Sequence, residues 1–98
     1  MPNLTVSVPH HLSQDEALQR IKTAVSKASV SGNVENLQEN WSANVGTFSG
    51  SAMGQSASAT ITVNPSDVTF DIVLPFAASL FKSQIESGLR DFTTKLLS

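Results

Sequence analysis

The stretch that decides the fold is residues 56–74, SASATITVNPSDVTFDIVL. Small or apolar side chains alternate with Ser and Thr up to residue 63, and a second alternation begins at residue 67. A period of two residues places alternate side chains on opposite faces of a β-strand. The intervening Asn-Pro-Ser-Asp at 64–67 is typical of a turn. The sequence therefore predicts two antiparallel strands, over about 56–63 and 67–74, each with one apolar face.

The N-terminal third predicts a strand followed by a helix. Residues 3–8 alternate in the same way, and Pro9 ends the run. Ser13 precedes Glu16 by three positions, the spacing of a capping box in which each residue bonds the other's backbone. Apolar residues then recur every three or four positions, which predicts a helix over about 13–28. Gly32 is expected to close it.

Two further strands are expected over about 34–42 and 44–52, with a turn or a bulge between them. Their register is not determined by the pattern, because Trp41 and Val45 share a parity that Phe48 breaks. Three glycines recur at a spacing of four residues in this region, and we expect them to lie in turns: Gly46, Gly50 and Gly54.

Pro75 fits the first turn of a last helix, predicted over about 76–97. Gly88 within it is expected to mark a close approach to the sheet. The helix carries a stripe at helical spacing that we expect to face the strands: Ala77, Leu80, Phe81, Gln84, Ile85, Gly88, Leu89, Phe92 and Leu96.

These elements give the order β-α-β-β-β-β-α and an α+β fold class. We expect one domain over residues 1–98, with a single antiparallel sheet of about five strands and both helices packed on one of its faces. The opposite face is expected to be uncovered.

Composition excludes several classes of protein. The 98 residues carry a formal net charge of -2, and only 14% are charged, which leaves little basic surface for binding nucleic acid. There is no cysteine, and no apolar run approaches the length of a membrane span. The first residues lack the basic and apolar segments of an export signal. We therefore expect a cytoplasmic protein without a membrane span.

The sequence offers no convincing catalytic, metal or cofactor site. His10 and His11 are adjacent and no third ligand stands at a metal-binding spacing. One of the two is expected to bond the start of the first helix or a neighbouring strand. A hydrolase, the weakest alternative, would need a carboxylate and a serine converging on one of these rings. We therefore expect a protein that is not an enzyme and holds no cofactor.

Residues 40–66 contain no charged side chain, although sheet edges are normally protected by charges. We expect a neutral edge or outer face here to contact a protein, a granule surface or a second copy of the chain through a sheet edge. A merely solvated face is the alternative. The candidate interaction residues are Ser56, Ser58, Thr60 and Thr62.

A small apolar-ligand carrier is the alternative function, with a slot between the C-terminal helix and the curved sheet. A lone tryptophan in so small a chain is, however, more often a core or core-rim residue than a binding aromatic. The residues that could line the slot are Trp41, Phe48, Phe70, Phe81 and Phe92.

Several short motifs together resemble a known family. They are His11-Leu12 with Ala17, Trp41, Phe48-Ser49-Gly50 with Gly54, Ile61-Thr62-Val63, Leu74, Phe81-Lys82-x-x-Ile85-Glu86 and Leu89. Over nearly its whole length the chain resembles the small bacterial polyhydroxyalkanoic acid system proteins. The resemblance implies a protein whose genes are associated with polyester storage, with no established enzymatic activity and no catalytic residues to transfer. This chain departs from the usual family pattern in its many serines and in the few charges between its central strands.

The resemblance and the uncharged strands together lead us to expect a non-enzymatic accessory or interaction protein of a bacterial polyhydroxyalkanoate system. It would contact a partner or itself through a neutral sheet surface.

Overall fold

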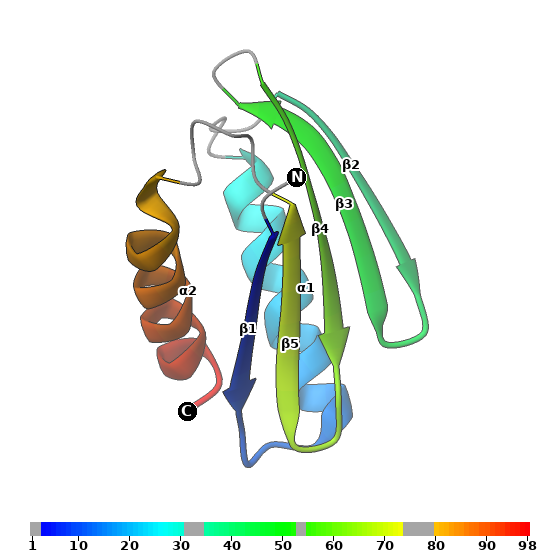
Figure 1. The fold of residues 1–98 in the computed structure, drawn as a ribbon. Coiled ribbons are helices and arrows are strands. Elements are labelled where there is room, and N and C mark those ends of the chain that lie inside the picture. The colour runs from blue at the N-terminus through cyan, green and yellow to red at the C-terminus, as the bar shows by residue number, and fades with distance from the viewer. Residues whose placement is uncertain (1–2, 31–34, 53–54, 74–79) are drawn as a thin grey trace.

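Five strands and two helices follow one another in the predicted order (Figure 1). The structure, a computed structural model, describes residues 3–30, 35–52, 55–73 and 80–98. The elements are β1 (Asn3–Pro9), α1 (Gln14–Val30), β2 (Glu35–Ser42), β3 (Val45–Ala52), β4 (Gln55–Val63), β5 (Asp67–Val73) and α2 (Lys82–Leu96). The predicted α+β class is confirmed.

The strands form one antiparallel sheet in the order β1-β5-β4-β3-β2. Helix α1 carries the chain from β1 at one edge to β2 at the other, and β3, β4 and β5 then return by hairpins. The uncharged β3 and β4 are therefore interior strands, paired on both sides. Most of the uncharged stretch 40–66 therefore lies in interior strands, and only residues 40–42 belong to the edge strand β2. The outer face of β3 and β4 is the larger neutral surface.

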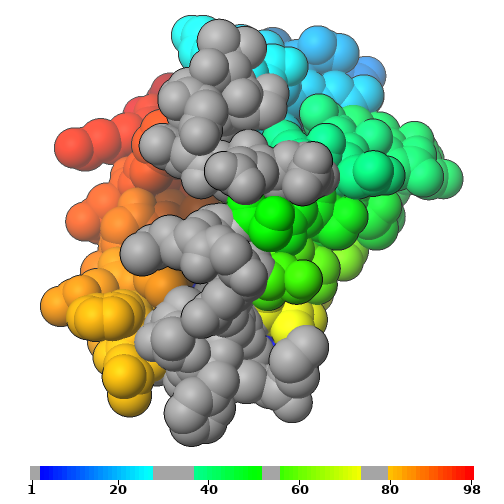
Figure 2. Space-filling view, turned by 90° about the horizontal axis from the view of Figure 1, so that it is seen from above, coloured from blue at the N-terminus to red at the C-terminus, as the bar shows by residue number. Residues whose placement is uncertain are grey.

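Both helices cover the same face of the sheet. The core contains Leu4, Val6 and Val8 of β1, with Val68 and Phe70 of β5 beside them. Helix α1 lies behind β4 and β5, and α2 lies beside β1 (Figure 1). Seen from above, α2 and the green strands β2 to β4 lie on opposite flanks of the molecule (Figure 2). The side chains that the helices bury are Ala17 and Ile21 from α1, and Thr93 and Leu97 from the end of α2.

Ser13 caps α1 as the sequence predicts. Its hydroxyl accepts from the Glu16 N–H at 3.2 Å, and its carbonyl accepts from the Ala17 N–H at 3.0 Å. The Glu16 carboxylate does not complete the box; it accepts from Arg20 Nε one turn later, at 3.2 Å. The helix continues to Val30, beyond the predicted end at 28. Gly32 lies outside the described residues.

Helix α2 starts later than predicted, and its apolar stripe is only partly buried. Leu80 and Phe81 precede the helix in a 3₁₀ turn, while Pro75 and Ala77 lie outside the described residues. Leu80, Phe81 and Phe92 are 80%, 55% and 58% exposed. The apolar stripe is wider than the surface of α2 that packs against β1, so Leu80, Phe81 and Phe92 lie outside the α2–β1 contact. The close approach expected at Gly88 is also wrong, because a Cβ there would meet nothing within 4 Å.

Gly46 and Gly50 lie within β3, so the prediction that they form turns is wrong; Gly54 is outside the described residues. The turn between β2 and β3 is instead made by Ala43 and Asn44, and Ala43 has a φ of 53°. The register irregularity lies further upstream, between Glu35 and Gln38. Gly46 is needed in the strand for space: Trp41 pairs with it, and its ring carbons lie 2.8 Å from where a Cβ would stand.

Candidate functional site

The uncovered face of the sheet is the candidate interaction site. The four predicted residues, Ser56, Ser58, Thr60 and Thr62, follow one another along the outer side of β4, while Ile61 and Val63 between them face the core. The structure therefore brings all four to one surface.

Neighbouring strands extend this surface with more hydroxyl groups. Ser58 pairs with Ser49 of β3, and Thr60 pairs with Thr47. On the other side of β4, Thr62 pairs with Thr69 of β5. Because paired residues point to the same face, hydroxyls stand side by side on three adjacent strands.

The carboxylates on this face lie toward the β1 edge. Asp71 accepts from the Thr5 hydroxyl at 3.0 Å, and Asp67 accepts from the Ser7 hydroxyl at 3.4 Å. All the lysines and arginines of the chain belong to α1 and α2. The outer surface of β3 and β4 is thus an uncharged hydroxyl field, bordered by acid on one side and without a base.

The five aromatic residues of the predicted slot do not gather at one site. Trp41 and Phe48 meet edge to face, with ring centroids 5.5 Å apart, whereas Phe70 is buried in the core. Phe81 and Phe92 are exposed on α2. An apolar recess of about 170 Å³ lies by Phe48, but no residue of α2 lines it. The slot between α2 and the sheet stays a prediction.

Trp41 is held at the rim of the core. Its indole N–H donates to the Glu39 carboxylate at 2.6 Å, and the Lys22 ammonium of α1 lies 5.3 Å from the ring centroid. The Lys22 contact joins the β2–β3 hairpin to α1, since a cation over an indole face is attracted to it. Trp41 is half-buried and packs against the core, so it lies at the core rim.

His10 has the structural role predicted for one of the two histidines. It is buried, its Nε2 donates to the Asn64 carbonyl at 3.0 Å, and its Nδ1 accepts from the Leu12 N–H at 3.1 Å. The ring therefore joins the start of α1 to the β4–β5 turn. With both nitrogens bonded to backbone groups, it is poorly placed to act as a base. His11 is exposed.

The residues that the structure describes contain no group of three or more His, Asp or Glu side chains that could hold a metal ion. Among the helices described, none combines the length and the apolar character required to cross a membrane.

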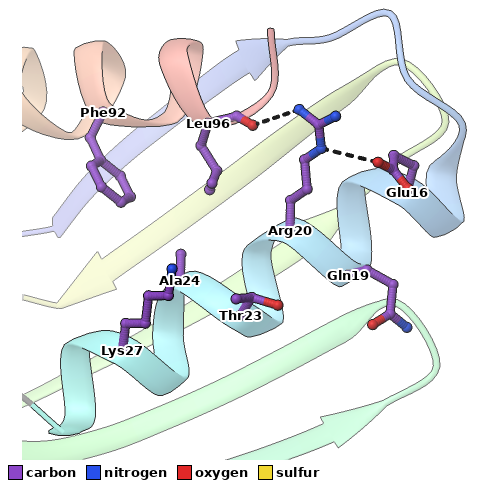
Figure 3. A pocket seen from close by; sticks show the side chains of 8 residues that line it. All are labelled: Glu16, Gln19, Arg20, Thr23, Ala24, Lys27, Phe92 and Leu96. Atoms are coloured by element: carbon purple, nitrogen blue, oxygen red, sulfur yellow. Dashed lines mark hydrogen bonds and ion pairs between the residues drawn. The ribbon is translucent and has the colours of Figure 1, made fainter.

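Sequence reasoning missed a groove between the two helices. It has a volume of about 610 Å³, and Lys27 of α1 and Phe92 of α2 face it (Figure 3). The sequence feature that indicates this groove is the width of the apolar stripe of α2, because packing against the sheet alone cannot bury all of it.

Comparison with known proteins identifies a protein family. The family model described as "Putative polyhydroxyalkanoic acid system protein (PHA_gran_rgn)" matches residues 4–97, which span the seven described elements except for Asn3 at the start of β1. No curated protein and no solved structure matches the chain at a significant level.

Proposed function

Because the chain belongs to this family of polyhydroxyalkanoic acid system proteins, we propose that it is a non-enzymatic accessory protein whose open sheet face contacts the surface of polyhydroxyalkanoate granules. The observation that carries the proposal is the uncharged hydroxyl field on the outer surface of β3 and β4. Its place of action would be the cytoplasm, in keeping with a chain that has no cysteine.

The chemistry of the two surfaces is complementary. A polymer of hydroxy acids joined by ester bonds offers carbonyl oxygens, which accept hydrogen bonds, and no donors along its length. Serine and threonine hydroxyls such as those of Ser58 and Thr60 are neutral donors. Removing water from a neutral hydroxyl costs far less than removing it from a charge, so this face can lie against a weakly polar surface.

The absence of an enzymatic role is part of the proposal. Its support is the arrangement around His10, whose ring nitrogens are both engaged with backbone groups of Leu12 and Asn64. A histidine that serves as a general base needs one nitrogen directed at the reacting group.

The experiment is co-sedimentation of the purified protein with isolated polyhydroxyalkanoate granules. The double variant Ser56→Lys/Ser58→Lys places two charges on the open face, and Ser87→Lys/Thr94→Lys places the same two charges on exposed positions of α2. We expect the first variant to lose most of the granule-bound fraction and the second to retain it. Thermal unfolding of both variants checks that the fold is intact.

Two results would contradict the proposal. One is equal binding by both variants; the other is a wild-type protein that stays in the supernatant. Sedimentation velocity tests the alternative that the open face binds a second copy of the chain. If the wild type is a dimer and the open-face variant a monomer, the face joins two copies of the chain.

A further inference from the structure

The groove between α1 and α2 lies on the opposite side of the molecule from the open sheet face. Ala24 and Thr23 of α1 form one wall, and Phe92 and Leu96 of α2 form the other (Figure 3). The Phe92 side chain extends between the helices, and 58% of it remains exposed. The volume of the groove, about 610 Å³, falls in the range of small-molecule sites, about 300–1,000 Å³.

One end of the groove is closed by Arg20. Its Nη1 donates to the Leu96 carbonyl at 3.0 Å and to the Ser98 carbonyl at 3.1 Å, while its Nε binds the Glu16 carboxylate at 3.2 Å. The guanidinium thus bridges the two helices, and its positive charge is already matched by Glu16. A ligand chain entering the groove would end at this bridge.

The other end carries a lysine. Lys27 lines the groove there, and no ion pair joins it to a side chain that the structure describes. The remaining charged lining residues, Glu16 and Arg20, neutralise each other. The groove is therefore apolar in the middle and positive at Lys27, although the whole chain is negative.

We propose that this groove binds a straight-chain monocarboxylate, with the carboxylate beside Lys27 and the alkyl chain lying between Ala24 and Phe92 toward the Arg20 bridge. Lys27 lies seven positions after Arg20 on α1, which corresponds to a rise of roughly 10 Å between their backbones along the helix. An extended medium-length alkyl chain such as that of octanoate has a comparable length.

This inference does not rest on the proposed granule contact. It concerns the groove between the helices, whereas the granule contact concerns the outer surface of β3 and β4, so either proposal can fail without the other. Both simple alkanoic acids and hydroxyalkanoic acids are straight-chain monocarboxylates, and the test compares one acid of each kind.

The test is titration of the ¹⁵N-labelled protein, followed by amide chemical shifts, with octanoate and with 3-hydroxyoctanoate. Octylamine replaces the carboxylate by a cation, and acetate removes the chain. We expect octanoate to shift resonances of α1 and α2 around Ala24 and Phe92, and neither control compound to do so. Comparing the two acids shows whether the 3-hydroxyl group adds affinity.

Three variants locate the site. Lys27→Gln should weaken octanoate binding by about fivefold, the effect of one exposed charge pair. Ala24→Leu should abolish binding, because its added carbons occupy the middle of the groove. Lys82→Gln removes a lysine of α2 outside the groove and should leave the affinity unchanged. Circular dichroism of each variant verifies folding.

The proposal is overturned by octanoate shifts confined to the open sheet face, by equal affinity in Lys27→Gln and the wild type, or by no saturable binding. Undiminished binding by a folded Ala24→Leu protein would also exclude this groove.

Discussion

The indole ring of Trp41 lies over Gly46, its partner residue across the β2–β3 hairpin. Two ring carbons stand 2.8 Å from the position of a Cβ on residue 46, and a ring carbon of Phe48 stands at 2.9 Å. The glycine leaves room for both rings, and the rings in turn cover a backbone that has no side chain of its own.

Gly46→Ala should therefore lower the free energy of unfolding by about 1–3 kcal/mol, the usual cost of overpacking. Urea denaturation measures the loss. The emission of Trp41, the single tryptophan, should shift as the ring is displaced. Wild-type stability together with an unchanged emission spectrum would show that the ring does not depend on this space.

Gly88→Ala should have the opposite effect. A Cβ at this position of α2 meets nothing within 4 Å, and alanine is favoured over glycine inside a helix by about 1 kcal/mol. Urea denaturation should show a gain approaching that value. A loss of stability would mean that residue 88 is in closer contact than the structure shows.

Ala43→Gly should stabilise the protein by about 0.5–1 kcal/mol, since alanine's cost at positive φ exceeds the entropic cost of glycine. Ala43 has a φ of 53°, in the region that favours glycine. Thermal unfolding gives the change. Ser42→Gly, one residue earlier in β2, is the matched control and should destabilise.

His10→Ala should reduce the free energy of unfolding by about 2 kcal/mol, since two hydrogen bonds of a buried ring are lost. His11→Ala removes an exposed neighbour and should change it by less than about 0.5 kcal/mol. Denaturation of the two variants under identical conditions makes the comparison. Equal stabilities would refute the structural role of His10.

Local patterns predicted the strands and the start of α1. The alternation of Leu4, Val6 and Val8 reports a face directly, and all three are buried. Ser13 caps its helix with groups only a few residues away. Such features depend on neighbours in the sequence, so the sequence contains them.

Features that depend on distant neighbours were not predicted. Helical spacing indicated the direction of the α2 stripe, but the width of the surface it would meet depends on how α2 sits beside β1. Phe92 was therefore expected to be buried and is exposed. The same holds for Gly46, which the sequence places in a turn. The position requires glycine because the Trp41 ring of a neighbouring strand fills the space of a side chain, and the local sequence does not show this contact.

The candidate surface shows the same division. Ser58 and Thr60 were placed on one face by their period of two, and the structure puts them there. Their neighbours Ser49 and Thr47 could not be assigned to that face, because the register of β3 was not readable from the sequence.

The two edges of the sheet differ in a way that limits assembly. At β1 the carbonyl of Ser7 is occupied by Arg90 Nη1 of α2, at 3.1 Å, and α2 packs against the strand. A visiting strand at this edge would have to displace the arginine, whereas β2 has no helix packed along it in the described part of the chain. Strand addition at β1 therefore requires the Arg90 contact to break, whereas no such contact stands at β2 in the residues that the structure describes. Two copies joined there would present a blocked β1 at each outer end, so such growth would terminate as a pair and could not propagate into a fibre.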